Sequence, residues 1–427
     1  MLRKGPGVAN ANRDVSLTVA LCVTEVLTLV GVFSFPALLP IFFEEWALSK
    51  TDAGWISGIY WAGNALAAGV LVSLTDRIDA RWIYLGGAVV GFIGSAGFAL
   101  YADGFWTALL FRAIAGIGLA GTYIPGLRAL IDRFKGPNSA RAIAIYTGTF
   151  SLGTATSFLV SGAIAEAFGW RWSFAAAGAA AALAFIIAAF TLGPAKPERK
   201  AEPTPLLDFR PVLSNRPAMG YILGYTVHTW ELTSLRSWTV AYLVFAASLT
   251  SADTGWFTPV TVATLSAVVA WAASVSGGEL TSRFDRRRTI ALLMAGSAIV
   301  CVLLGFAAPL PYPVVAAILL VYAGFVQSDA GALNTGTTQA ARAGQRGLTL
   351  ALHSMIGMTF AFLGPLAFGM VLDATGGGLT PASWATAFAL MGISIFIGPL
   401  ILHWARPRVR VIAQTAAHGP PPPPPGR

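Results

Sequence analysis

The chain has 427 residues, of which 56% are hydrophobic and only 11% charged, and its formal net charge is +9. Soluble domains carry about 25% charged residues, whereas whole stretches of this chain, such as the 40 residues of 289–328, contain no Asp, Glu, Lys or Arg. Such runs leave no polar face for a surface helix, so they exclude a water-soluble protein, a secreted disulfide scaffold and a nucleic-acid-binding domain, and they predict a polytopic membrane protein.

The N-terminal segment 1–15 is polar, and the first apolar run follows it directly. This run has no small-residue cleavage site after a short core, so we expect a retained first span and not a signal peptide. Cys22 and Cys301 lie in apolar segments far apart in the chain. We interpret both as buried free thiols, because a disulfide framework or a metal site requires clustered ligands.

About 20 apolar residues cross the bilayer core as a helix, in which every backbone polar group is satisfied. Dividing the chain at charges and at Gly/Pro breaks predicts twelve spans and an all-α membrane protein. The expected spans are 16–41, 54–75, 82–102, 106–131, 142–167, 171–193, 217–246, 255–280, 289–308, 314–340, 347–372 and 382–404.

The basic residues orient these spans. Twenty-three of the 28 lysines and arginines lie in the two terminal segments or in the loops after even-numbered spans, and the opposite side has only Lys50 and Arg171. By the positive-inside rule, both termini are expected in the cytoplasm of a bacterial-type inner (plasma) membrane or a membrane derived from it. The excess of positive charge then reflects topology and contact with anionic lipid, not a nucleic-acid partner.

The polar, proline-containing segment 194–216 predicts a cytoplasmic linker between two six-helix bundles, 16–193 and 217–404. The tail 405–427 ends in six prolines, Pro420 to Pro425, which we interpret as a solvated tail more readily than as a recognition ligand.

The two bundles echo each other in sequence. The loop 75–81 (Thr-Asp-Arg-Ile-Asp-Ala-Arg) matches 281–287 (Thr-Ser-Arg-Phe-Asp-Arg-Arg) at four of seven positions, and 52–55 mirrors 253–256. These matches indicate a divergent duplication of one half.

In these loops the chain resembles the major facilitator superfamily of secondary transporters. Asp76, Arg77 and Arg81 match the signature of the family's loop between spans 2 and 3, although Val72 and Asp79 stand where the family usually has glycine.

Other segments extend the resemblance over all twelve spans. In span 4, Arg112, Gly116 and Gly118 are similar to the family's Arg-x-x-x-Gly-x-Gly element, and residues 169–172 (Gly-Trp-Arg-Trp) also look like the family. In span 5, Gly153 is followed by threonine where the family's drug–proton antiporters have proline. This difference argues against drug efflux as the function without excluding it.

The resemblance implies two pseudo-symmetric six-helix bundles that rock around a site at mid-membrane, with spans 1, 4, 7 and 10 lining the cavity. It also implies gating roles for seven loop residues: Asp76, Arg77, Asp79, Arg81, Arg283, Asp285 and Arg287.

Charged groups at the bilayer centre cost about 2.5–3.5 kcal/mol, so those that occur there are usually functional. Those well inside the spans fall on the four helices expected to line the cavity, with His353 in span 11 as the exception. They are Glu25 in span 1, Arg112 in span 4, His228, Glu231 and Arg236 in span 7, and Asp329 in span 10. Three other acids, Glu166, Glu279 and Asp373, lie near span ends and can reach the headgroups.

We therefore expect Arg112 and Arg236 to bind the negative groups of a small polar or anionic solute, with Glu25 and Asp329 as further binding residues. His228 and Glu231, three residues apart, share a helix face and are expected to exchange the coupled proton. A structural ion pair at Arg112 and structural roles for Glu25 and Asp329 remain open, and Arg236 is expected to serve a partner other than Glu231. His353 is interpreted as a hydrogen-bonded core histidine.

Two other functions remain open. A cation or metal ion could use Glu25, Glu231 and Asp329, or the chain could be a non-transporting membrane receptor or assembly protein that works through its proline tail. An enzyme is not expected, because no nucleophile–base set or metal-ligand cluster is recognisable.

A Gly-x-Gly-x-x-Gly match at 116–121 lies within an apolar span and follows no strand, so it fits helix packing better than a dinucleotide site. No phosphate-binding loop is present in the sequence, and no cofactor is expected. The expected partners are a small solute, protons and membrane lipid, and we expect a monomer.

Overall fold

The computed structural model describes residues 6–75, 77–134, 136–195, 208–250, 254–342 and 344–406. Every regular element in these residues is a helix. Asp76, most of the expected linker and the polyproline tail lie outside the described residues. We call the end of the molecule where the first helix begins and the last helix ends the basic end, and the other end the far end.

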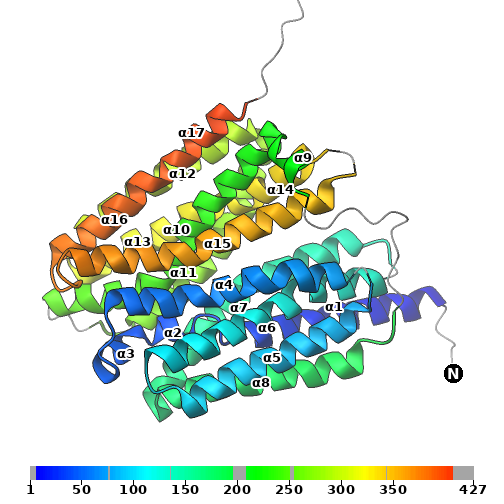
Figure 1. Cartoon of the computed structure of the whole chain (residues 1–427), viewed down its shortest axis with the longest axis horizontal. Helices are drawn as coiled ribbons and strands as arrows, with labels where there is room; N and C mark the ends of the chain where they lie inside the picture. The colour runs from blue at the N-terminus through cyan, green and yellow to red at the C-terminus, as the bar shows by residue number, and fades with distance from the viewer. Residues whose placement is uncertain are drawn as a thin grey trace, which may run out of the picture.

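The first half of the chain forms a layer of eight helices, drawn in blue to green in the lower part of Figure 1. They are α1 (Pro6–Leu29), α2 (Ser34–Ala37), α3 (Leu39–Glu45), α4 (Lys50–Leu74), α5 (Ala80–Tyr101), α6 (Phe105–Arg133), α7 (Ser139–Phe168) and α8 (Trp170–Thr191).

The second half forms the upper layer of Figure 1. Its helices are α9 (Arg210–Leu213), α10 (Arg216–Thr250), α11 (Pro259–Arg283), α12 (Arg286–Phe306), α13 (Tyr312–Ser328), α14 (Ala330–Ala340), α15 (Arg346–Ala374), α16 (Pro381–Ile395) and α17 (Ile397–Trp404).

Helix thus occupies each of the twelve expected ranges, and in the described residues nine segments are long and apolar enough to cross a membrane. The other three expected spans coincide with α1 and its short continuation, with α4 and with α10. Helix α10 is long enough at 35 residues, but His228, Glu231 and Arg236 interrupt its apolar run.

Three expected spans are broken, which the division into continuous spans missed. Span 1 divides into α1, α2 and α3, and Pro36 and Pro40 lie in that region without an N–H to continue one helix. Span 12 divides at Phe396 into α16 and α17. Pro399 explains this break, because a proline ring clashes with the carbonyl four residues earlier, which here is Ile395. Span 10 divides at Asp329, and no proline lies at that break.

Glycines bring α5 and α6 into close contact. A Cβ on Gly118 would lie 2.5 Å from the backbone of Gly91, and one on Gly121 would lie 2.6 Å from Gly87. The glycines of the 116–121 motif therefore pack helices together, as the sequence interpretation proposed.

The repeated loops end in the same structural device in both halves. The Asp79 side chain accepts a hydrogen bond from the Arg81 amide at the start of α5, and Asp285 accepts one from the Arg288 amide at the start of α12. The repeat thus supplies a carboxylate cap to the third helical span of each half.

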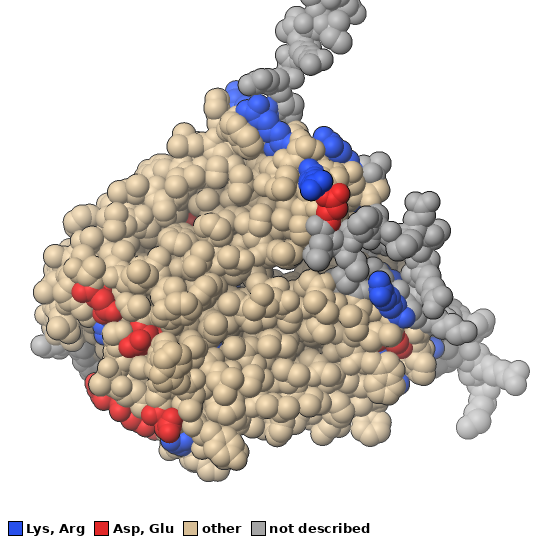
Figure 2. All heavy atoms as spheres, in the orientation of Figure 1, with Lys and Arg blue, Asp and Glu red and all other residues tan. Residues whose placement is uncertain are grey.

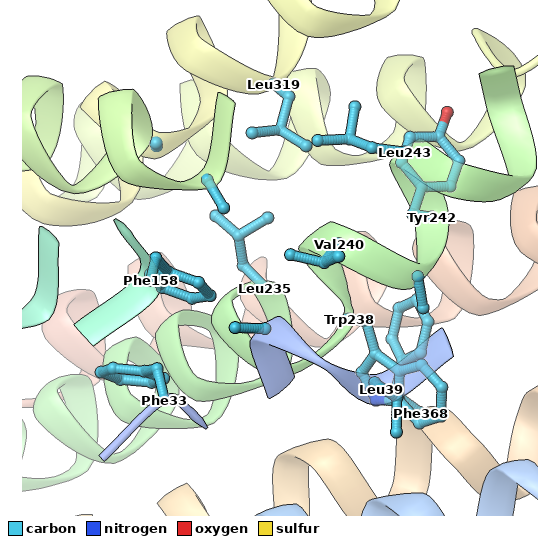
Figure 3. Close-up of a cluster of buried hydrophobic side chains, with 14 of the residues drawn as sticks. Phe33, Leu39, Phe158, Leu235, Trp238, Val240, Tyr242, Leu243, Leu319 and Phe368 are labelled. Carbon is cyan, nitrogen blue, oxygen red and sulfur yellow. The ribbon is translucent and has the colours of Figure 1, made fainter. Parts of the chain in front are cut away.

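The two layers meet along α4 with α15 and α7 with α11, and α10 also touches the short helices α2 and α3. One large apolar cluster draws on both halves. In Figure 3, Phe33 and Phe158 of the first half lie beside Leu235 of α10, and Trp238 lies near Leu39 and Phe368. This shared core places α10 against the break in span 1.

Candidate functional site

Arg236 is a buried cation on α10 without an acidic partner. Its side chain is only 7% exposed, yet among the described residues no carboxylate forms an ion pair with it. Its Nη2 donates one long hydrogen bond of 3.4 Å to the Gln327 side-chain oxygen on α13. The guanidinium lies 5.4 Å from the Phe33 ring centre in the other half. A buried charge needs compensation, so this guanidinium retains capacity for an external anion.

Arg112, on α6, has a different environment. Its two terminal nitrogens donate to the backbone carbonyls of Gly31 and Val32 at 2.9 and 2.8 Å, and its guanidinium lies 4.4 Å from the Tyr60 ring centre. These carbonyls are left without helical partners where α1 ends. Arg112 therefore stabilises the break in span 1 through backbone carbonyls, and no ion pair of Arg112 is present in the described residues.

The same break is stabilised from α7. Ser157 accepts a hydrogen bond from the Phe33 amide at 2.9 Å and donates to the Val30 carbonyl at 2.7 Å, while Ser34 and Ser161 hydroxyls lie 2.8 Å apart. Arg112 and Arg236 thus approach one short segment, 30–33, from opposite halves. The serines carried no recognisable signal in the sequence, because serine is common in membrane helices.

His228 of α10 pairs with Asp329, the residue at the break between α13 and α14. The imidazole Nδ1 lies 2.7 Å from the Asp329 carboxylate, and both side chains are buried. Sequence analysis grouped Asp329 with the solute-binding residues and paired His228 with Glu231. The structure differs because span 10 breaks at Asp329 and brings this carboxylate to the imidazole.

Glu231 accepts a short hydrogen bond from Ser297 of α12, and Tyr322 of α13 also lies close to its carboxyl group. Asp329 is near enough to interact electrostatically with Glu231. No lysine or arginine in the described residues forms an ion pair with Glu231. His228, Asp329 and Glu231 therefore form one buried titratable cluster between α10, α12 and the broken span 10.

Glu25 lies in the other half, in the contact between α1 and α7. Thr149 donates to one of its carboxylate oxygens at 2.5 Å, and the second oxygen is buried without a hydrogen-bond partner. Glu25 is thus a buried acid, separate from the cluster around Asp329.

His353 of α15 bonds to polar side chains of α14. Its Nε2 lies 2.9 Å from Asn334 and its Nδ1 3.2 Å from the Thr337 hydroxyl, and Tyr225 stacks on the ring at 3.9 Å. The interpretation as a hydrogen-bonded core histidine is confirmed.

Of the expected gating residues in the first half, Asp79 and Arg81 make contacts within that half. Asp79 forms a 2.6 Å ion pair with Arg133 and accepts a 2.7 Å bond from the Ala195 amide, and Arg81 donates to the Ala189 carbonyl. Burial opposes ionisation of Asp79, but the bonds from Arg133 and from the amides of Arg81 and Ala195 outweigh it and lower the pKa of this carboxyl. Arg77 is exposed, and Asp76 lies outside the described residues.

In the second half, Arg283 pairs with Glu279 on the surface at 2.8 Å, while Arg287 donates long bonds to the Leu402 and Pro217 carbonyls. Together with the Asp285 cap, these contacts also stay within one half.

At the far end, Asp373 joins the two halves. Its carboxylate oxygens accept hydrogen bonds from the backbone amides of Lys50 and Thr51 at 3.0 and 2.7 Å, so the last turn of α15 caps the first turn of α4. Sequence analysis placed Asp373 near the end of a span, from which it can reach the headgroups. The structure adds a partner that the sequence did not predict, because the otherwise unpaired amides at the start of α4 bind the carboxylate.

Along the same contact α4 and α15 touch through backbone. A Cβ on Gly58 would lie 2.4 Å from the Phe362 carbonyl oxygen, and one on Gly54 would lie 2.7 Å from that of Pro365. We call this contact, with the Asp373 cap, the far-end seam. Glycines at these positions are required for the close approach.

No group of three or more His, Cys, Asp or Glu side chains in the described part of the chain is arranged to hold a metal ion.

Comparison with solved structures shows the fold. A bacterial homologue of the human lysosomal transporter Spinster, in an inward-facing and unoccupied conformation, superposes with a TM-score of 0.70 at 19% identity, over 94% of this chain and 96% of the other. The nucleoside transporter NupG (D323A mutant) superposes with a TM-score of 0.73 at 15% identity, over 91% and 99%.

Curated relatives match over shorter regions. The niacin transporter NiaP of Acinetobacter baylyi is 26% identical over 157 residues, which cover 37% of this chain and 35% of NiaP. Human protein spinster homolog 1 is 21% identical over 243 residues, 54% of this chain and 46% of that protein. The chain thus spans between about a third and a half of the length of these relatives.

The sequence pattern that defines the Major Facilitator Superfamily matches residues 21–328, well over half of the chain. Together with the all-helical membrane fold, this match confirms the resemblance seen in the loops and in span 4: the chain belongs to the Major Facilitator Superfamily, whose members are transporters and not enzymes.

Proposed function

We propose that this protein is a secondary active transporter that moves a small anionic solute by alternating access and couples the movement to protons. The observation that carries the proposal is Arg236, a buried guanidinium between the two halves whose single side-chain hydrogen bond within the described residues is a long one to Gln327.

The anion site is centred on Arg236. A carboxylate can accept two parallel hydrogen bonds from a guanidinium, and such charge-assisted bonds are worth about 1.5–3 kcal/mol each. Gln327 can orient the solute from α13, and the Phe33 ring supplies an apolar face from the other half. Because these groups come from both halves, a bound anion would couple solute binding to the movement of one half against the other.

The proton site is the cluster of His228, Asp329 and Glu231. Burying two carboxylates near each other without a lysine or arginine is costly, so a proton on the cluster lowers that cost. The cluster shares α10 with Arg236, and Asp329 lies two residues after Gln327. Proton binding and anion binding thus act on the same two helical segments.

The remaining expectations belong to this proposal. The bundles 16–193 and 217–404 are the two moving bodies, joined by the linker 194–216. The distribution of basic residues favours cytoplasmic termini in a bacterial inner membrane, and we propose a monomer as the working unit.

Niacin is a suitable first solute. It is a small aromatic carboxylate, which suits a guanidinium beside a phenyl ring, and one relative is a niacin transporter. The nucleoside transporter matches by fold alone, so nucleosides serve as uncharged comparison solutes.

The test is transport by the full chain reconstituted in liposomes that contain a pH-sensitive dye, with the membrane potential clamped to zero. An inward gradient of niacin or of another small monocarboxylate should acidify the lumen. Arg236→Gln should reduce the initial rate by at least about tenfold, since it removes charge-assisted bonds. Arg141→Gln, an exposed charge at the basic end, is the matched control and should transport at the wild-type rate.

Two results would contradict the proposal. Undiminished uptake by Arg236→Gln would exclude the assigned anion site. Uptake of organic or metal cations that depends on Glu25, Glu231 and Asp329 would show that the transported solute is a cation and not an anion.

A further inference from the structure

A second site, independent of the transported solute, lies at the basic end of the second half. A groove of about 380 Å³ opens between the start of α12 and the end of α17. Its lining combines Arg287, Arg288, Arg406 and His403 with apolar residues that include Leu292 and Pro399. Figure 2 shows basic side chains at the top of the molecule, where α17 ends in Figure 1.

The charge of this groove is uncompensated. Three arginines line it, and no carboxylate is among its described lining residues. Arg288 and Arg406 are exposed and form no ion pair in the described part of the chain. Arg287 makes long bonds to two carbonyls and lies 4.8 Å from the Tyr221 ring centre. Of the nearby acids, Asp285 caps the start of α12 by accepting a bond from the Arg288 amide, and Glu279 is paired with Arg283. The groove therefore favours an anion with several acceptor oxygens.

The sequence repeat allows the same position to be compared in the first half. The repeat aligns Arg81 with Arg287, and both donate to a carbonyl near the end of the last span of their half, Ala189 and Leu402. The next residue is Trp82 in the first half and Arg288 in the second. The second half thus has an exposed cation where the first half has an exposed aromatic side chain.

The apolar part of the groove is exposed on the surface of the helices. Leu292, one turn beyond Arg288 on α12, is 73% exposed. Trp404 at the end of α17 is 50% exposed and stacks with the Arg216 guanidinium at 4.7 Å, which is typical of a side chain at the membrane–water boundary. A ligand here meets cations at its polar end and hydrocarbon at the other.

We propose that this groove binds an anionic phospholipid of the leaflet at the basic end, with its phosphate between Arg288 and Arg406 and an acyl chain along Leu292. Basic pockets between membrane helices are known to hold anionic headgroups. The phosphate chemistry would also suit a free phosphate ion, but the exposed apolar wall favours a lipid.

The experiment measures lipid binding to the full purified chain in neutral detergent, by thermal shift and by native mass spectrometry. Phosphatidylglycerol should raise the unfolding temperature and remain bound, whereas phosphatidylcholine should do neither. The double variant Arg288→Gln/Arg406→Gln should weaken binding of phosphatidylglycerol at least tenfold. Arg210→Gln/Arg342→Gln removes two exposed charges at the same end and should stay within twofold of wild type.

Leu292→Ser tests the apolar side of the groove separately. It should weaken the binding of phosphatidylglycerol without creating a thermal shift in response to inorganic phosphate. If inorganic phosphate raises the unfolding temperature as much as the lipid does, the proposal is overturned in favour of a site for a free phosphate ion. Equal weakening by both double variants would overturn it in favour of diffuse charge attraction. Because the readout needs no transported solute, either failure is distinguishable from failure of the proposed transport function.

Discussion

The two buried arginines of this site, Arg112 and Arg236, have different surroundings and different roles. Both terminal nitrogens of Arg112 donate hydrogen bonds to backbone carbonyls at the break in span 1. Arg236 instead donates one long hydrogen bond to the side-chain oxygen of Gln327. Sequence position predicted that both arginines are buried on cavity-lining spans, but it could not tell them apart, because the difference depends on carbonyls freed by a helix break.

This difference predicts opposite effects on stability. Arg112→Gln should destabilise the protein by about 2–5 kcal/mol, because it leaves buried carbonyls without donors. Arg236→Gln removes an uncompensated charge and should leave the unfolding temperature unchanged or higher. Thermal unfolding of the two variants in one detergent makes the comparison, and a drop for Arg236→Gln as large as that for Arg112→Gln would contradict it.

Glu231 carries a prediction about coupling. Glu231→Gln keeps a partner for Ser297 but cannot release a proton, so we expect solute-driven acidification to stop while solute exchange at equal concentrations continues. Liposomes that report pH and radiolabelled exchange together measure both. Thr149→Val in the other half, which removes the bond to Glu25, is the control for a general loss of polarity. Gradient-driven acidification that survives Glu231→Gln would remove the proton role from Glu231.

Two helices, α5 and α12, have an aspartate cap at their first turn. Asp79 caps α5 and pairs with Arg133, and its pKa is lowered in the fold. A lowered pKa contributes stability above the unfolded value, about 3.9, and that contribution is lost as pH falls through the folded value. The stability gap between wild type and Asp79→Asn should therefore be full at neutral pH and shrink below about pH 4. Unfolding measured from pH 3 to 7 tests this, and a constant gap would contradict it.

At the far-end seam the cap joins two halves. Asp373→Asn weakens the interaction with the start of α4 by about 0.3–1 kcal/mol, so the seam should open about two- to fivefold more often. Ala53 is buried beside it on α4. A cysteine placed there, with Cys22 and Cys301 replaced, should react faster with a water-soluble maleimide in Asp373→Asn. Asp103→Asn, on an exposed far-end loop, is the matched control and should leave the rate unchanged.

For the whole molecule, long apolar runs predicted where the helices lie, because a helix in the bilayer needs about 20 apolar residues, and nine of the expected spans in the described residues are long and apolar enough to cross a membrane. The break at Asp329 was missed because no proline marks it, and the contacts that stabilise the break in span 1 were missed because Arg112 and the α7 serines reach it from other helices. The same limit explains why Ser297, Gln327 and Tyr322 were not foreseen: neutral polar residues are common in membrane helices and carry no signal without their contacts.

The tail offers a prediction at this scale. Deleting residues 419–427 should leave solute transport and lipid binding unchanged, because every group in both proposed sites lies before residue 407. Transport by the truncated chain in liposomes is the measurement. Loss of activity by a truncated chain that is still folded would favour the receptor or assembly alternative.

The polarity of α10 has a consequence for how the protein is made. A glutamate and an arginine at mid-membrane each cost about 2.5–3.5 kcal/mol when a helix enters the bilayer alone. The groups that offset this cost are encoded downstream: Gln327 follows Arg236 by 91 residues and Ser297 follows Glu231 by 66. At about 5–20 residues per second of translation, α10 emerges seconds before its partners exist. During membrane insertion, α10 must therefore be kept out of contact with lipid until α12 and α13 have been made. Either the insertion machinery or the completed first half can provide that protection.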